Sequence, residues 1–235
     1  MKHTLLIKDW LSSFLSLLFP HCCVVCGRPL AKGEECICTV CNINLPRTNY
    51  HLRKDNPVER LFWGQIPLER ATSFFFYEKG SDFRLILHRL KYGGQKEIGA
   101  IMGRYMAAEL LSSNFFQGID VIIPIPLHKK KQQIRGYNQS EWIARGIAAV
   151  TGIPIDTESI LRKKNTETQT RKSVFERRDN VEGIFELQHP ETLAGKHILI
   201  VDDVLTTGST TLACASCLVN VEGIRISILT LAMVE

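Results

Sequence analysis

The sequence lacks the glycine-rich motifs that hold dinucleotides and ATP. Neither G-x-G-x-x-G nor G-x-x-x-x-G-K-[ST] occurs in its 235 residues, so nucleotide sites of the Rossmann and P-loop types are poorly supported. Internal repeats and low-complexity tracts are also missing. The contents of 45% hydrophobic and 23% charged residues are ordinary for a globular protein. We therefore expect one large domain, or one domain with a small added module, around a normal core.

A secretion signal and a membrane-spanning segment are missing as well. The first apolar stretch is interrupted by Lys8 and Asp9, and no small-residue cleavage site follows it, which is unlike a signal peptide. The stretch is too short and too interrupted to cross a bilayer. Its helical spacing predicts an amphipathic helix at residues 1–20 that packs on the domain or on a partner; contact with a membrane surface is the alternative and is not expected. We therefore expect a cytoplasmic protein.

The cysteines are unevenly distributed along the chain. Six of the eight lie between Cys22 and Cys41, and clustered thiols in a reducing cytosol suggest a metal site more than disulfides. Four of them form two C-x-x-C pairs, which together can complete a tetrahedral zinc site. These predicted zinc ligands are Cys23, Cys26, Cys38 and Cys41. A module of residues 21–50 buries little apolar surface, so the metal would supply the missing folding energy.

The remaining cysteines leave alternatives open. Cys22 could replace Cys23 in the metal site, and Cys36 stands at a less usual spacing. Unliganded thiols or an iron–sulfur cluster would also fit the pattern. Cys214 and Cys217 share one face of an expected helix among small and apolar neighbours, which favours a buried helix face over half of a metal site.

From about residue 68 the pattern alternates between short apolar strands and helices. The expected strands are residues 71–77, 121–125, 197–201 and 225–231, and the expected helices include residues 101–111, 139–150 and 212–219. This alternation predicts an α/β domain over residues 65–235, built on a parallel-centred sheet. Such sheets bind their ligands at the carboxyl ends of the strands.

Residues 198–211 carry the most informative pattern in the chain. Four apolar residues form a short buried strand, Asp202 and Asp203 follow it, and a loop of small hydroxyl residues around Gly208 leads into a helix. Loop N–H groups and a helix N-terminus favour a phosphate. Because the two carboxylates would repel that phosphate, they suit hydroxyl groups or a metal about one sugar ring away. A ribose 5-phosphate satisfies both requirements, with its phosphate on the loop and its hydroxyl groups on the two acids. An ordinary strand end followed by a turn is the alternative.

This run resembles the phosphoribosyl pyrophosphate (PRPP) signature of type I phosphoribosyltransferases. Further segments narrow the resemblance to the ComF family (competence protein F) and extend it from about residue 12 to the end of the sequence. These segments are Cys23-x-x-Cys26, Leu90-Lys91-Tyr92-Gly93-Gly94, Pro124-Ile125-Pro126-Leu127-His128, Arg135-Gly136-Tyr137-Asn138-Gln139, Thr168-Gln169 and Arg178-x-Asn180-Val181.

The resemblance implies a type I phosphoribosyltransferase-like fold with a small N-terminal zinc-ribbon-like module. Asp202 and Asp203, the catalytic candidates, would hold the ribose hydroxyls and favour the positive charge that develops on the ring. Mg²⁺ would bind the pyrophosphate and ribose oxygens, and zinc would be structural. The residues expected to bind PRPP are Asp202, Asp203, Thr206, Thr207, Gly208, Ser209, Thr210, Arg135 and Lys91.

Two basic stretches, residues 128–135 and 162–178, could supply the counter-charge that a pyrophosphate needs. Arg135 is the strongest candidate for a phosphate ligand because its planar guanidinium can take two oxygens at once. Residues 129–138 or 166–173 could form the loop that closes over the reaction, whereas a solvated loop suits most of these lysines.

The net charge of +5 permits an anionic partner without demanding one. A groove for single-stranded nucleic acid would use the same basic residues, with Tyr92, Tyr137 and Trp142 as stacking surfaces. A place in the core is the alternative for these aromatic side chains.

The ComF resemblance implies a PRPP-binding competence protein that handles incoming single-stranded DNA in natural transformation. It places the protein at the cytosolic side, near the inner face of the membrane, and leaves contact with proteins of the DNA-uptake machinery open. The alternatives are an active phosphoribosyltransferase that transfers ribose 5-phosphate to a base or amine in nucleotide metabolism, and a zinc-bearing scaffold with a vestigial site. The intact acid pair speaks against the scaffold, and the cysteine module favours the competence protein over the salvage enzyme. Whether the site turns over stays open.

Overall fold

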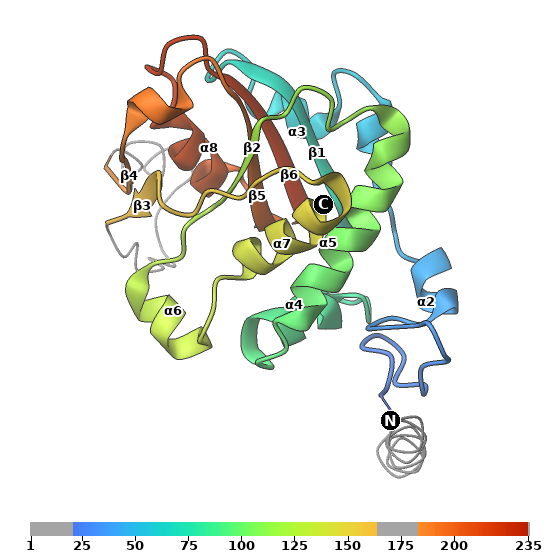
Figure 1. Cartoon of the computed structure of the whole chain (residues 1–235). Coiled ribbons are helices and arrows are strands. Elements are labelled where there is room, and N and C mark those ends of the chain that lie inside the picture. Colours follow the sequence, from blue (N-terminus) through green and yellow to red (C-terminus); the bar gives the residue numbers. More distant parts are fainter. Residues whose placement is uncertain (1–20, 164–182, 235) are drawn as a thin grey trace, which may run out of the picture.

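A four-stranded parallel sheet forms the centre of the molecule (Figure 1). The computed structural model describes residues 21–163 and 183–234. The strands of the central sheet are β1 (Leu68–Tyr77), β2 (Val121–Pro124), β5 (His197–Leu205) and β6 (Arg225–Val234). They lie in the order β1-β6-β5-β2, and each neighbouring pair runs parallel. Near-continuous apolar runs are typical of parallel strands buried on both faces, and the expected α/β class is confirmed.

Further elements cover both faces of this sheet. They are α3 (Pro57–Arg60), α4 (Arg84–Tyr92), α5 (Glu97–Leu110), α7 (Gln139–Thr151), α8 (Ser209–Ser216) and the antiparallel pair β3 (Ile160–Arg162) and β4 (Phe185–Leu187). One face packs on α4, α5 and α7 in a core cluster that includes Leu90, Met102 and Ile143. The other packs on α3, α8 and the β3–β4 pair, in a second cluster that includes Val58 and Cys214.

Helices α5 and α7 pack at close range through two glycines. A Cβ atom on Gly103 would lie 2.3 Å from the carbonyl oxygen of Ile143, and one on Gly146 would lie 2.1 Å from that of Ala100. A larger residue at either position would push the helices apart. This contact fixes the start of α7, where the side chain of Asn138 caps the helix, beside the carboxyl edge of the sheet.

Residues 129–135 form helix α6 (Lys129–Arg135), and the expectation of a solvated loop there was wrong. The His128 side chain caps the helix through Nδ1, which accepts the Lys130 N–H at 3.2 Å. Gly136 ends the helix in the left-handed region at φ 79°, a common stop signal. The intervening Lys, Gln, Ile and Arg residues form helices readily. The loop was expected only because the segment is highly charged.

Strand β5 continues to Leu205, beyond the end expected at residue 201. Asp202 pairs with Thr230 of β6 and the ladder extends past it, so the acid pair lies within the strand rather than in a loop after it. Because aspartate is depleted in strands, sequence reasoning placed the strand end too early.

The cysteine segment packs directly on α5. It contains the short helix α2 (Thr39–Ile43), and its buried Cys36 belongs to the same core cluster as Met102 of α5. Cys36 Sγ lies 3.9 Å from Met102 Sδ, and an ion pair joins Glu35 to Arg104. The cysteine segment therefore shares a hydrophobic core with the sheet domain.

Short 3₁₀ turns in the described part of the chain span Tyr50–Leu52, Leu111–Ser113 and Pro190–Leu193. Across residues 21–163 and 183–234, no helix is both long enough and apolar enough to cross a bilayer. Three predicted features lie outside the described residues: the helix at residues 1–20, the closing loop at residues 166–173, and the basic stretch of residues 162–178 beyond residue 163.

Candidate functional site

Asp202 and Asp203 lie near the end of β5, and each carboxylate has a different partner. Asp202 Oδ1 accepts a hydrogen bond from Ser140 Oγ at 3.0 Å, at the start of α7, and another from the Asp203 N–H at 2.8 Å. Asp203 Oδ1 lies 3.1 Å from Lys91 Nζ, at the end of α4. The acid pair therefore links the ends of two helices, and it brings Lys91 to the predicted PRPP site.

The environment of Asp202 disfavours its charge. Burial raises the pKa of Asp202 to about 7, and the negative charge of Asp203 acts in the same direction. Hydrogen bonds from the Asp203 N–H and the Ser140 hydroxyl, together with the charge of Lys91, oppose this rise. Near neutral pH a carboxyl in this state can either accept or donate a hydrogen bond, which suits contact with a hydroxyl group.

The predicted phosphate loop follows β5 directly. Thr206, Thr207 and Thr210 are exposed, and Thr207 Oγ1 lies 2.9 Å from Ser209 Oγ. Helix α8 begins at Ser209, earlier than the expected start at residue 212, so its unpaired first-turn N–H groups adjoin these hydroxyls. Hydroxyl and N–H donors at a helix start can bind a phosphate.

Gly208 shapes the middle of this loop. Its φ is 75°, in the left-handed region, and a Cβ atom there would lie 3.3 Å from the ring of Phe62, which is fully buried. Glycine adopts such a conformation at little cost. The loop can therefore lie flat against Phe62 and leave its outer side open.

Positive side chains from three elements lie near one another, and two of them, Lys91 and Arg162, interact with the acid pair. Burial lowers the pKa of Lys131, and the charges of Arg162, Arg135 and Lys91 lower it further, so these four cations lie within electrostatic reach of one another. Burial also lowers the pKa of Arg162, and the charge of Asp202 opposes this effect. These cations come from α4, α6 and β3. Such a cluster is suited to a polyanion.

Arg135 is held by two neighbouring side chains. Its Nη1 donates to Gln139 Oε1 at 2.9 Å, and its guanidinium carbon lies 5.5 Å from the centre of the Tyr92 ring. A guanidinium stacked on an aromatic ring keeps a defined orientation. The structure therefore joins α6 to the end of α4 next to Lys91.

The aromatic residues considered for stacking divide into two groups. Tyr137 is buried, and its hydroxyl donates to the Leu90 carbonyl at 2.5 Å, so it belongs to the core. Tyr92 is 69% exposed. Trp142 is partly exposed between the charged groups of Lys96 and Arg145. Tyr92 and Trp142 therefore remain accessible to a ligand.

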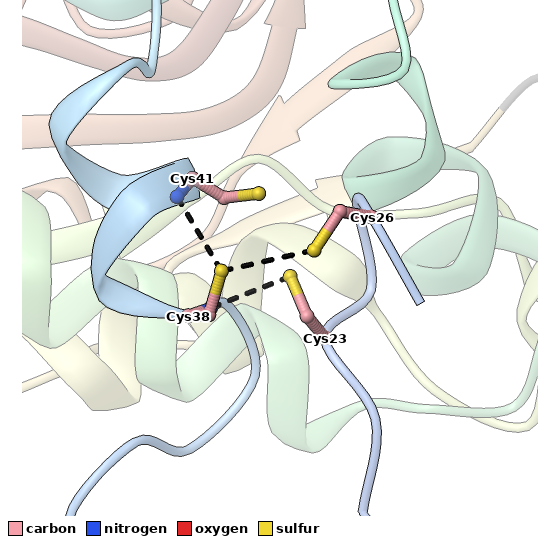
Figure 2. Close-up of side chains that lie close together, drawn as sticks. All are labelled: Cys23, Cys26, Cys38 and Cys41. Atoms are coloured by element: carbon pink, nitrogen blue, oxygen red, sulfur yellow. Dashed lines mark hydrogen bonds between the residues drawn. The ribbon is translucent and has the colours of Figure 1, made fainter. Parts of the chain in front are cut away.

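Four cysteines form a compact cluster in the N-terminal module (Figure 2). The sulfur atoms of Cys23, Cys26, Cys38 and Cys41 all lie within 4.8 Å of one another, and those of Cys26 and Cys38 are 3.7 Å apart. Tetrahedral zinc with Zn–S bonds of about 2.3 Å places its sulfur ligands about 3.8 Å apart. The Cys38 N–H donates to Cys23 Sγ at 3.3 Å. The donor set and the distances fit a metal ion such as zinc.

The thiols differ in their readiness to ionise. A hydrogen bond from the backbone of Arg28 lowers the pKa of Cys26 to about 6, which favours the thiolate that binds a metal. Burial raises the pKa of Cys36 to about 12, so this thiol stays protonated beside Met102. The cluster contains Cys23 and does not include Cys22, whose backbone instead bridges to Pro29.

Of the second cysteine pair, Cys214 lies in a helix and is buried, whereas Cys217 is half-buried. Cys214 is fully buried in α8, and Cys217 Sγ donates to the Cys214 carbonyl at 2.9 Å. Cys217 lies just beyond the end of the helix.

Sequence reasoning missed Ser140, and it included Lys131 and Arg162 only as members of the two basic stretches expected to supply counter-charge. Ser140 was detectable, because it stands two residues after Asn138, a typical N-cap residue at the start of an expected helix. Lys131 and Arg162 lie within basic stretches, and nothing in their spacing singles them out.

The fold and the site together define a class of protein: a phosphoribosyltransferase-type domain with a four-cysteine module packed on it. Residues 139–234 match the family model of the phosphoribosyl transferase domain. The matched residues include the acid pair, the hydroxyl-rich loop and helix α8.

Curated relatives extend the similarity over most of the chain. DNA utilization protein YhgH of Escherichia coli O157:H7 is 32% identical over 209 residues, which cover 83% of this chain and 88% of that protein. Competence protein F of Haemophilus influenzae is 31% identical over a region that covers 54% of this chain and 57% of that protein. Competence protein ComFC of Bacillus subtilis is 24% identical, with coverage of 88% and 75%. The chain belongs to the ComF family, and the names of these relatives support a role in competence.

Proposed function

We propose that this chain is a PRPP-binding competence protein that handles single-stranded DNA at the cytosolic side of the membrane during natural transformation. The observation that carries the proposal is the acid pair within β5, followed at once by the hydroxyl-rich loop and the start of α8. The relatives named for competence and DNA utilization support the DNA-handling part.

PRPP would contact three parts of the site. The 5-phosphate would lie on the loop from Thr206 to Thr210, and the ribose hydroxyls would face Asp202 and Asp203. The pyrophosphate would face the four cations described above. Lys91, which pairs with Asp203 in the structure, could pair with a phosphate oxygen instead. Two carboxylates are few ligands for Mg²⁺, which keeps several waters and binds substrate phosphates in such sites. Mg²⁺ would therefore enter as a complex with PRPP.

The four-cysteine cluster would hold structural zinc. Four sulfur ligands leave no open coordination position, which is characteristic of structural rather than catalytic sites. Cys26, the most exposed member, would ionise readily, and Cys23, Cys38 and Cys41 are buried. The ion would fix the module against α5.

An active phosphoribosyltransferase is the second candidate function. The match of residues 139–234 to the phosphoribosyl transferase domain favours it, and so does the presence of both acids. In such a reaction the bond from the anomeric carbon to the pyrophosphate breaks and a base or amine takes the leaving group's place. The carboxylates would stabilise the positive charge that develops on the ribose ring.

Pyrophosphate release separates the two candidates. Purified protein would be mixed with Mg²⁺ and PRPP, with and without single-stranded DNA, while pyrophosphate release and PRPP binding are both followed. We expect saturable PRPP binding without sustained release, as in a ligand-binding competence protein. Sustained release would instead establish a transferase or a PRPP hydrolase. Absence of PRPP binding in both conditions would contradict the proposed site.

A further inference from the structure

Helix α4 presents one face to solvent along its whole length. Arg84, His88 and Tyr92 recur at every fourth residue and are all exposed, whereas Ile86, Leu87 and Leu90 are buried against the sheet; we call the three exposed residues the α4 stripe. At a rise of about 1.5 Å per residue, the stripe spans about 12 Å. It therefore offers an extended surface to a partner, and the described residues leave that surface open.

The charged residues within the stretch that carries the stripe have one sign. From Arg84 to Lys96 the chain contains four basic residues and no acidic residue. Lys91 is engaged with Asp203, and Arg84 Nη1 donates to the Lys79 carbonyl at 3.0 Å, which leaves most of its donors available. This surface favours an anion, and its length favours a chain of anions over a single one.

Aromatic rings stand among these charges at the carboxyl end of α4. Tyr92 has the guanidinium of Arg135 at 5.5 Å and the His88 ring at 5.3 Å between centres. On helix α7, which packs on α5, the Trp142 ring lies 4.8 Å from Lys96 Nζ and 4.9 Å from the Arg145 guanidinium. Alternating cations and exposed rings are the combination with which proteins bind unpaired nucleotides.

The position of α4 connects the two functional regions of the chain. Its last turn holds Lys91 against Asp203, and Figure 1 places the helix between the cysteine segment and α6. Leu87 and Leu90 of α4 share a core cluster with Cys36 and Cys38. A strand lying along α4 would therefore run from the side of the cysteine module to the edge of the acid pair.

We propose that the α4 stripe is the track for single-stranded nucleic acid, with phosphates on Arg84 and His88 and a base stacked on Tyr92 beside Arg135. The inference rests on the proposed DNA-handling function and assigns it a surface. Duplex DNA fits less well, because its bases are already stacked and cannot reach the Tyr92 ring. An acidic protein segment would satisfy the charge, but it would leave the exposed rings without a matching partner.

Fluorescence anisotropy with a labelled oligo(dT) strand tests this assignment. We expect Tyr92→Ala to weaken binding about tenfold or more, since base stacking on an aromatic ring contributes on that scale. Tyr92→Phe should retain most of the affinity, because it keeps the ring. The double variant Arg84→Ala with His88→Ala should weaken binding and flatten its salt dependence, because phosphate contacts are lost.

A matched control exists at the opposite edge of the sheet. Trp63 is 53% exposed, has the Arg60 guanidinium at 5.9 Å, and lines a cavity with Leu68 at the start of β1. Trp63→Ala should leave oligo(dT) binding unchanged. Equal affinities for wild type and Tyr92→Ala, or a loss in Trp63→Ala alone, would overturn the assignment. Tighter binding of an acidic peptide than of oligo(dT), with the same dependence on Tyr92, would overturn it in favour of a protein partner.

Calorimetry with Mg²⁺ and PRPP keeps this inference separate from the proposed function. The Arg84→Ala, His88→Ala variant should bind PRPP like the wild type, since neither residue contacts the acid pair or the loop. If the wild-type protein binds PRPP and fails to bind any oligo(dT), the result contradicts both the DNA-handling part of the proposed function and the assignment of the α4 stripe. If oligo(dT) binds and the stripe variants behave like wild type, the stripe alone is wrong.

Discussion

At the scale of single residues, the acid pair is held in place by the protein before any ligand arrives. Asp202 is fixed by Ser140 and by the N–H of Asp203, and Asp203 is fixed by Lys91. A preorganised carboxylate pair costs less to arrange when a ribose binds. The arrangement lowers the stability of the folded protein, because burial disfavours the charged form of Asp202.

This cost predicts a pH-dependent effect of Asp202→Asn on stability. The pKa of Asp202 in the folded protein is about 7, above its usual 3.8, so the folded state binds more protons than the unfolded state between these values. Wild-type stability from this group therefore falls as pH rises from about 4 to about 7. Asn cannot ionise and still accepts from Ser140. At about pH 8 the ligand-free variant should be more stable by about 2–4 kcal/mol, with little difference at about pH 4; urea unfolding at both pH values measures this.

Asp156→Asn provides a control of opposite sign. Burial alone would raise the pKa of Asp156, but hydrogen bonds from Ser159 and Glu158 outweigh it and lower the pKa. A lowered folded pKa stabilises the protein above the unfolded value, and that contribution is lost as pH falls. Asp156→Asn should therefore be less stable than wild type at about pH 8. A stabilisation by Asp202→Asn that does not change with pH would contradict the raised pKa.

The sequence was sufficient to find the contiguous part of the site. Asp202, Asp203 and the residues from Thr206 to Thr210 lie within nine consecutive positions, so local pattern and family resemblance identified them together. Lys131 and Arg162 join them only through folding, so the sequence indicated their basic stretches as a source of counter-charge without singling out these two residues. The assignment of these residues to PRPP stays a prediction until a ligand is measured.

At the scale of elements, the cysteine module and α5 form one structural unit. Cys36 packs against Met102, and ion pairs join Glu35 to Arg104 and Arg47 to Glu109. The exposed Glu35–Arg104 pair contributes little by itself. The shared core and the metal would carry most of the attachment, because a segment this short buries too little surface to hold its shape alone.

Substitution of one cluster cysteine should remove the metal. We expect about one zinc per wild-type chain and none after Cys38→Ser, since three thiolates bind zinc far more weakly than four. The free energy of unfolding should fall by more than about 2 kcal/mol, because metal binding contributes to folding. Elemental analysis and urea unfolding measure the two effects.

Cys22→Ser is the matched control, because Cys22 precedes Cys23 directly and lies outside the cluster. It should keep its zinc. Loss of zinc in Cys22→Ser with retention in Cys38→Ser would contradict the ligand set. Freshly purified wild-type protein without metal would remove the structural role of the cluster altogether.

Elements with a strong apolar pattern could be predicted from the sequence. A helix made mostly of charged residues and the exact end of a strand could not. The strands of the sheet and helices α5 and α7 have unbroken apolar periodicity, which sequence patterns detect well. Helix α6 was missed because its solvent-facing lysines carry no apolar stripe, although His128 and Gly136 mark its two ends. The end of β5 was placed too early because its last residues include the acid pair. Acidic residues are unusual in strands, and the requirements of a site can override strand preference.

At the scale of the whole molecule, one edge of the sheet collects the chemistry. The acid pair, the hydroxyl-rich loop, the cation cluster and the end of α4 all meet where β5 finishes. Helix α4 then leads away from that edge beside the cysteine module (Figure 1). A small phosphorylated ligand and a nucleic-acid strand could therefore occupy neighbouring surfaces, and each could alter the affinity of the other by equal factors.

Calorimetric titration of Mg²⁺ and PRPP into three proteins tests the central claim most directly. The account predicts saturable binding to wild type, and binding more than about tenfold weaker to Asp202→Asn with Asp203→Asn, because hydrogen bonds to charged acceptors are lost. Gly208→Ala should also weaken binding, since its φ of 75° and the nearby Phe62 ring strain any side chain there. Equal PRPP affinity in all three folded proteins, or no binding to wild type, would contradict the account.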